Sequence, residues 1–108
     1  MTTLTRADWE QRARDLTIEG RAFINGEYTD AVSGETFDCL SPVDGRVLGK
    51  IASCDVADAQ RAVENARATF NSGVWSRLAP SKRKATMIRF AGLLKQNAEE
   101  LALLETLD

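Results

Sequence analysis

The stretch 33-SGETFDCLSPVDGRVLGKIA-52 carries the clearest signals for the fold of this chain. In its middle, Pro42 and Gly45 predict a tight turn, because proline fixes φ early and glycine closes the turn. After the turn, Val47, Gly49 and Ile51 alternate with Leu48, Lys50 and Ala52. This alternation indicates a strand over residues 47–52 that is partly covered on both faces. We expect the strand before the turn at residues 36–40.

Two more turns are expected before this pair of strands. Asn25-Gly26 lies between Phe23 and Tyr28 and predicts a two-residue hairpin, because both central residues of a type I′ turn need positive φ. A second turn is expected at Ser33-Gly34. The segment between residues 23 and 34 is therefore predicted to be a short β region.

A helix is predicted from Thr5 to Ile18. Thr5 can cap it, with Asp8 at the third helical position, which is close to a capping box. Gly20 is expected to end the helix. Its single narrow apolar stripe consists of Trp9, Ala13 and Leu16.

The second half of the chain predicts further helices. Asp55 can cap the first, with Asp58 three residues on, and Gly73 can end it. Pro80 suits the first turn of the next helix. Asn97 with Glu100 would cap a new helix if the run breaks near Gln96. The apolar positions at helical spacing, expected to form the buried sides, are Val56, Ala59, Val63, Ala66 and Phe70, then Met87, Ile88, Ala91, Leu94, Ala98 and Leu101.

The overall charge gives no sign of nucleic-acid or membrane binding. The chain has 108 residues, 44% of them hydrophobic, and a net charge of −2. Residues 65–98 nevertheless contain no acidic side chain, and we call this segment the basic window. We favour a solvated face or a set of salt-bridge partners at an interface. The alternative is a free-standing interaction module that uses the basic window to bind a partner or nucleic acid. The basic side chains are Arg67, Arg77, Lys82, Arg83, Lys84, Arg89 and Lys95.

The residues by themselves offer no catalytic site. The chain has no histidine, so a Cys–His or Ser–His pair cannot be built within it. Cys39 and Cys54 have neither CxxC nor zinc spacing, and we interpret both as reduced thiols that fill apolar space in a cytoplasmic protein. Neither a phosphate-binding glycine motif nor a secretory signal is present.

These residues predict an α/β unit that does not close a core by itself. A lone hairpin is marginally stable. At the end of the chain, Leu101, Leu104 and Leu107 line one side of a helix with no visible partner. We therefore expect further polypeptide to cover this helix.

Several phrases, taken in order, resemble the N-terminal segment of the aldehyde dehydrogenase superfamily. They are "INGEY", "SPVDG" and "ALLETLD", together with Trp75-Ser76 followed by Pro80 and Arg83. Each is modest alone, but their order and spacing are specific, and the match runs from about Arg21 to Asp108. The resemblance implies the N-terminal portion of that fold, namely an N-terminal helix, a β-hairpin and strands, then two or three helices. It also implies a helical extension at 1–20 and a truncated segment of an incomplete Rossmann-like cofactor domain at 21–108.

Family enzymes oxidise an aldehyde to a carboxylic acid with NAD or NADP. The resemblance implies a cysteine nucleophile that forms a thioester, an oxyanion pocket and a glutamate base. All of these belong to later parts of the family chain, and neither Cys39 nor Cys54 matches the nucleophile's motif. We therefore expect these 108 residues to be inactive alone and the parent enzyme to be a homo-oligomer acting on a small-molecule aldehyde, without nucleic-acid or membrane partners.

The resemblance also implies a structural monovalent cation. Its ligands would be backbone carbonyls of Cys39 and Leu40 and the side chain of Asp108, since oxygen ligands suit a hard cation. A capping role for Asp108 is the equally weighted alternative.

The lead-in "IEGRAFINGEY" resembles one branch of the family. That branch contains the bacterial γ-glutamyl-γ-aminobutyraldehyde dehydrogenases and related enzymes of polyamine and ω-amino aldehyde breakdown. The resemblance therefore implies an aldehyde of that kind as the substrate.

Overall fold

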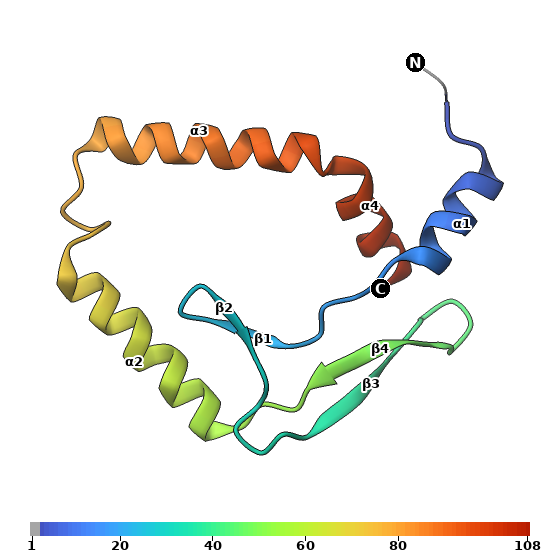
Figure 1. Ribbon diagram of the computed structural model, residues 1–108, viewed down its shortest axis with the longest axis horizontal. Coiled ribbons are helices and arrows are strands. Elements are labelled where there is room, and N and C mark those ends of the chain that lie inside the picture. The colour runs from blue at the N-terminus through green and yellow to red at the C-terminus, as the bar shows by residue number, and fades with distance from the viewer. Residues whose placement is uncertain (1–2) are drawn as a thin grey trace.

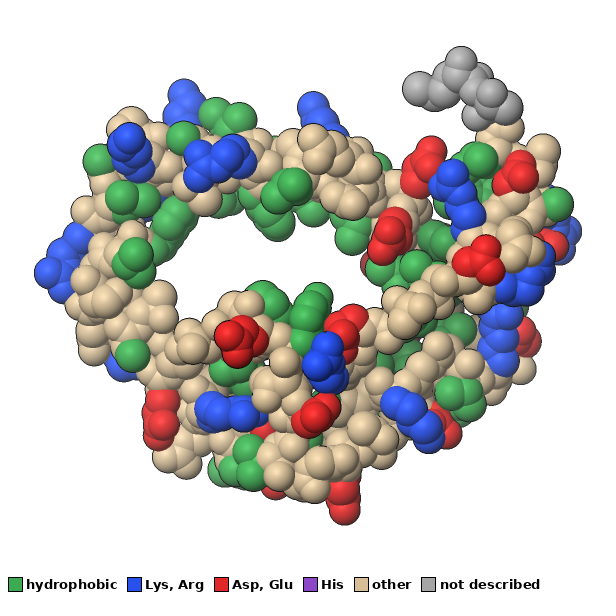
Figure 2. All heavy atoms as spheres, in the orientation of Figure 1, with side chains coloured by type: hydrophobic (Ala, Val, Ile, Leu, Met, Phe, Trp, Pro, Cys, Tyr) green, Lys and Arg blue, Asp and Glu red, His purple; other side chains and the backbone are tan. Residues whose placement is uncertain are grey.

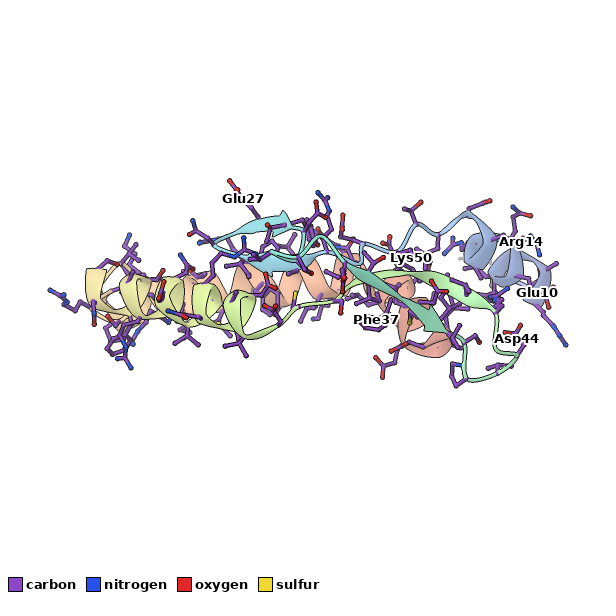
Figure 3. All side chains as sticks on the ribbon, turned by 90° about the horizontal axis from the view of Figure 1, so that it is seen from below. Glu10, Arg14, Glu27, Phe37, Asp44 and Lys50 are labelled. Carbon is purple, nitrogen blue, oxygen red and sulfur yellow. The ribbon has the colours of Figure 1, made fainter. Side chains whose placement is uncertain are left out.

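The computed structural model describes residues 3–108, which form a thin ring measuring 49 × 41 × 17 Å (Figure 1). Seen from the side, the elements lie in a shallow layer (Figure 3). The predicted α/β class is confirmed. In chain order the elements are α1 (Arg6–Asp15), β1 (Ala22–Ile24), β2 (Glu27–Thr29), β3 (Thr36–Leu40), β4 (Val47–Ala52), α2 (Val56–Ser72), α3 (Pro80–Gln96) and α4 (Ala98–Leu107).

The β3–β4 hairpin has the strands and the turn expected from the sequence. The strands are antiparallel, with Cys39 opposite Gly49 and an irregularity between Cys39 and Leu40. The turn is closed by the Gly45 N–H, which donates to the Ser41 carbonyl at 2.9 Å. Gly45 has φ of 73°, which glycine adopts without strain.

The β1–β2 hairpin also forms as predicted. Asn25 and Gly26 have φ of 56° and 76°, as a type I′ turn requires. The turn sets Phe23 opposite Tyr28, and their rings meet edge to face with centroids 5.1 Å apart. The next turn, at Ser33-Gly34, is confirmed by the Gly34 N–H, which donates to the Ala31 carbonyl at 2.8 Å.

The helices begin and end largely where their capping residues predict. Asp55 and Asp58 form a capping box at the start of α2, and Gly73 ends it with φ of 80°. The break after Gln96 is confirmed, but the predicted capping of α4 by Asn97 is wrong. The Asn97 side chain instead donates to the Leu93 carbonyl at 2.8 Å, so it satisfies the end of α3. Between residues 3 and 108, no helix has the length and hydropathy needed to cross a membrane.

The N-terminal helix is shorter than predicted, and Gly20 has a different role. α1 ends at Asp15, because Leu16 already has extended backbone with ψ of 126°. Gly20 lies beyond the helix and runs against β4, where its carbonyl accepts from Ala52 N at 2.8 Å. A Cβ at Gly20 would lie 1.8 Å from the Lys50 carbonyl oxygen. This glycine is therefore required for close approach of two backbones, not for helix termination.

The ring has almost no apolar core. Within residues 3–108, the buried apolar side chain is Ala31, at 5% exposure. The predicted buried sides of α2 and α3 are exposed instead, with Val63 at 67% and Ile88 at 61%. Figure 2 shows the reason, since apolar side chains border the central opening and have no second layer against them. The sequence pattern thus identified the apolar faces, but this chain does not cover them.

Candidate functional site

The end of the chain meets strand β3. The Cys39 thiol donates to a carboxylate oxygen of Asp108, with 3.5 Å between Sγ and Oδ1. Leu40 follows Cys39 directly, across the irregularity in the hairpin, with its side chain 56% exposed. The structure therefore brings two of the three predicted cation-binding residues into contact and places the third beside them.

A groove surrounds this contact. Its floor is β4, with Leu48 and Ile51, and its wall is α4, whose Leu101, Leu104 and Leu107 face the groove. These leucines are the ones that sequence periodicity placed on one side of the last helix. The groove is mainly apolar, and its charged side chains are the carboxylates of Glu105 and Asp108.

The electrostatics at Cys39 oppose thiolate formation. The pKa of the Cys39 thiol is raised above its ordinary value of 9.0, first by partial burial and then by its hydrogen bond to Asp108 and the negative charge of Asp108. A nucleophilic cysteine needs the opposite shift, because the thiolate is the reactive form.

Changing Asp108 to asparagine should make Cys39 more reactive. The variant removes the negative charge next to Sγ, so the thiol pKa should fall and more thiolate should form at mildly alkaline pH. The measurement is the rate of maleimide labelling, with exposed Cys54 as the internal reference. Glu105→Gln, in the same groove, is the matched control. Equal Cys39 rates in the two variants would contradict the assigned effect of Asp108.

The residues present fit a hard cation only in part. Asp108 supplies one carboxylate at the end of β3. In the described part of the chain, no group of three or more His, Cys, Asp or Glu side chains is arranged to hold a metal ion. The cation held by the Cys39 and Leu40 carbonyls and Asp108 therefore stays a prediction.

The glycines with positive φ among the described residues do not form a phosphate-binding loop. A phosphate-binding loop needs glycines that open onto a helix N-terminus. The glycines with positive φ are located elsewhere, because three lie in β turns and one ends α2. They are Gly26, Gly34, Gly45 and Gly73. We therefore assign no step of cofactor chemistry to residues 3–108.

Asp58 has a larger role than the capping one predicted for it. Its side chain is 2% exposed and is the largest fully buried one among residues 3–108. One carboxylate oxygen accepts from Val32 N at 3.0 Å and from Arg61 at 3.1 Å, and the other accepts from Asp55 N at 3.1 Å. Asp58 therefore joins the loop after β2 to α2. No local pattern signals this contact, because Val32 lies 26 positions away.

The basic window lies on the surface. Its lysines and arginines are exposed, apart from half-buried Arg83, and none belongs to an ion pair among residues 3–108. This agrees with a solvated face.

Cys54 is also exposed, so its interpretation as a buried filler is wrong. Glu99, whose side chain is 64% exposed, forms an ion pair with Arg12 at 2.6 Å.

The family model "Aldehyde dehydrogenase family" matches residues 28–108. The chain belongs to the aldehyde dehydrogenase family. It is 50% identical over 102 residues to the NADP/NAD-dependent aldehyde dehydrogenase PuuC of Escherichia coli K12. That match covers 94% of this chain and 21% of PuuC, so the chain spans about a fifth of the length of this relative. The resemblance inferred from the sequence is therefore confirmed.

Solved structures of family members have the same arrangement of elements. A mutant of the indole-3-acetaldehyde dehydrogenase AldA of P. syringae, in complex with NAD+ and IAA, has a TM-score of 0.94 and 83% identity, covering 97% of this chain and 21% of that one. The γ-glutamyl-γ-aminobutyraldehyde dehydrogenase of Burkholderia cenocepacia J2315 has a TM-score of 0.94 and 55% identity, covering 96% and 21%. The predicted N-terminal portion of the aldehyde dehydrogenase fold is thereby confirmed.

Proposed function

We propose that these 108 residues contribute to an NAD(P)-dependent enzyme that oxidises an aldehyde to its carboxylic acid. The observation that carries the proposal is the 50% identity to PuuC across 94% of the chain. An NAD+ complex of a relative with 83% identity supports the cofactor class. The cysteine thioester, oxyanion pocket and glutamate base implied by the resemblance would come from polypeptide beyond these residues.

We propose an ω-amino or γ-glutamylamino aldehyde as the substrate. The relatives that support this class are the B. cenocepacia γ-glutamyl-γ-aminobutyraldehyde dehydrogenase and the aminoacetaldehyde dehydrogenase of Pseudomonas aeruginosa, which is 40% identical over 105 residues. A specific observation favours a second candidate, indole-3-acetaldehyde, because AldA is more similar at 83% identity. The two candidates differ in charge and aromaticity, so a substrate panel separates them.

The contribution of this chain would be structural. Apolar residues of α2 and α3, such as Val63, Phe70 and Ile88, are each more than 60% exposed. Such surfaces in water favour association with a complementary apolar surface. We propose that further enzyme polypeptide covers them, in a cytoplasmic homo-oligomer that also holds the predicted cation.

The test is an activity assay of the protein expressed from its complete reading frame. NAD+ or NADP+ reduction should accompany oxidation of γ-glutamyl-γ-aminobutyraldehyde and aminoacetaldehyde, with a higher kcat/KM than for indole-3-acetaldehyde. The isolated 108-residue chain, as control, should show no turnover. Preference for indole-3-acetaldehyde would overturn the substrate proposal, and no activity on any aldehyde would overturn the reaction class. Salt-sensitive DNA binding would instead support the interaction module of residues 65–98.

A further inference from the structure

The N-terminal helix α1 lies outside the matched family region, yet it contacts the last helix. The family model begins at residue 28, whereas α1 ends at Asp15 and packs against α4. The contact joins segments separated by 87 positions in the sequence. In Figure 1, the end of α1 lies beside α4, close to the C-terminus of the chain. This contact therefore joins the two ends of the described secondary structure.

The main polar contact between the two helices is an ion pair. A guanidinium nitrogen of Arg12 lies 2.6 Å from a carboxylate oxygen of Glu99, and the guanidinium also lies 5.3 Å from the centre of the Trp9 ring. Trp9 therefore holds Arg12 in position on α1, and Arg12 reaches α4. Beneath this contact, Trp9 and Leu103 line the same two grooves, so apolar surface from both helices lies close together.

The segment after α1 is fixed to the β3–β4 hairpin. Gly20 is bonded to Ala52 of β4, and Ile18 lines the same groove as Leu107 and Asp108. The path from α1 to Gly20 therefore runs between α4 and the hairpin. A chain segment fixed to β4 at one end and to α4 at the other restrains the distance between them.

Helix α4 is stabilised neither by burial nor by a capping side chain in this chain. It has 10 residues, it lacks a side-chain cap at its N-terminus, and none of its residues is buried. Helices of this length are marginal in water without tertiary contacts. Its order must therefore depend on its neighbours.

We propose that α1 acts as a strap, a segment that holds α4 against the β3–β4 hairpin. The ion pair between Arg12 and Glu99 links this strap to α4. The strap restrains the end of α4, which leads directly into Asp108 and its contact with Cys39. The N-terminal extension is thereby a positioning element for α4. This role does not depend on which aldehyde the enzyme oxidises.

Hydrogen exchange of charge-reversal variants tests the strap. The variants are made in the protein expressed from its complete reading frame. Arg12→Glu should place two negative charges together, because it replaces an attraction to Glu99 by a repulsion. Amide exchange of Ala98–Leu107 should then be about three- to tenfold faster than in the parent protein. Glu99→Arg should have a similar effect. The double variant, which restores opposite charges, should return exchange to within about twofold of the parent. Exchange in α2 serves as the internal reference.

Two control variants separate the strap from effects on each helix alone. Arg14→Glu makes the same charge change on α1, where Arg14 donates a hydrogen bond to Gln11 of the same helix and forms no ion pair among residues 3–108. Glu100→Arg makes the same change in the first turn of α4. The amide exchange rate of α4 should be closer to that of the parent protein in Arg14→Glu than in Arg12→Glu. It should likewise be closer to the parent in Glu100→Arg than in Glu99→Arg. Equal effects of Arg12→Glu and Arg14→Glu, or no recovery in the double variant, would overturn the proposal.

Discussion

Replacing Gly20 by alanine should lower the free energy of unfolding by about 3 kcal/mol, the upper part of the usual range for overpacking. The new Cβ would lie 1.8 Å from the Lys50 carbonyl oxygen and 2.8 Å from the Lys50 carbonyl carbon. Both are backbone atoms of β4 and cannot rotate away as a side chain can. The segment would have to separate from β4 and lose the hydrogen bond between Ala52 N and the Gly20 carbonyl.

The measurement is urea unfolding of the protein expressed from its complete reading frame. Gly92→Ala is the matched control, because a Cβ at Gly92 meets nothing within 4 Å and the residue lies inside α3. Alanine there should stabilise the helix by about 0.5–1 kcal/mol. Equal stability of the two variants would show that Gly20 and β4 do not approach each other this closely.

Replacing Asp58 by alanine should cost about 3 kcal/mol of stability. The substitution leaves the backbone N–H groups of Val32 and Asp55 without their acceptor and removes the carboxylate that pairs with Arg61. Removing one partner of a buried polar contact costs the desolvation of the groups left behind. Because Arg61 is 41% exposed, water can still reach part of its guanidinium, so the backbone N–H groups account for most of the loss.

The stability of Asp58→Ala is compared with that of two further variants. Asp58→Asn keeps the shape and one acceptor oxygen, so it should lose about 1–2 kcal/mol. Asp55→Ala removes the exposed capping side chain of the same helix and should lose about 1 kcal/mol. Urea unfolding of all three variants should therefore place Asp58→Ala as the most destabilised. If Asp55→Ala were equally destabilised, Asp58 would act only as a capping residue.

Local patterns predicted the turns and most helix ends of this chain correctly. The positive φ of Gly26, Gly45 and Gly73 and the capping box at Asp55 depend on residues at most a few positions apart. Such features follow from backbone sterics and neighbouring hydrogen bonds, which are present in any short segment. The family, likewise, was recognisable from short phrases in a specific order.

The candidate site is different, because its contacts join distant segments. Cys39 and Asp108 are 69 positions apart, and only the family resemblance associated them before the structure placed them in contact. The ion pair between Arg12 and Glu99 had no sequence signal, since charged residues on exposed helix faces are common and do not indicate a partner. Gly20 looked like a helix terminator because the sequence does not show which strand will pass beside it.

Residue order along the chain was sufficient to predict the secondary structure, the apolar faces and the membership of the aldehyde dehydrogenase family. The three-dimensional arrangement was needed to show that α2 and α3 border an opening, that Asp58 is buried and that α1 packs against α4. Local conformation depends on interactions within a few residues, whereas burial and pairing depend on which distant surfaces meet, and that is decided only when the chain folds.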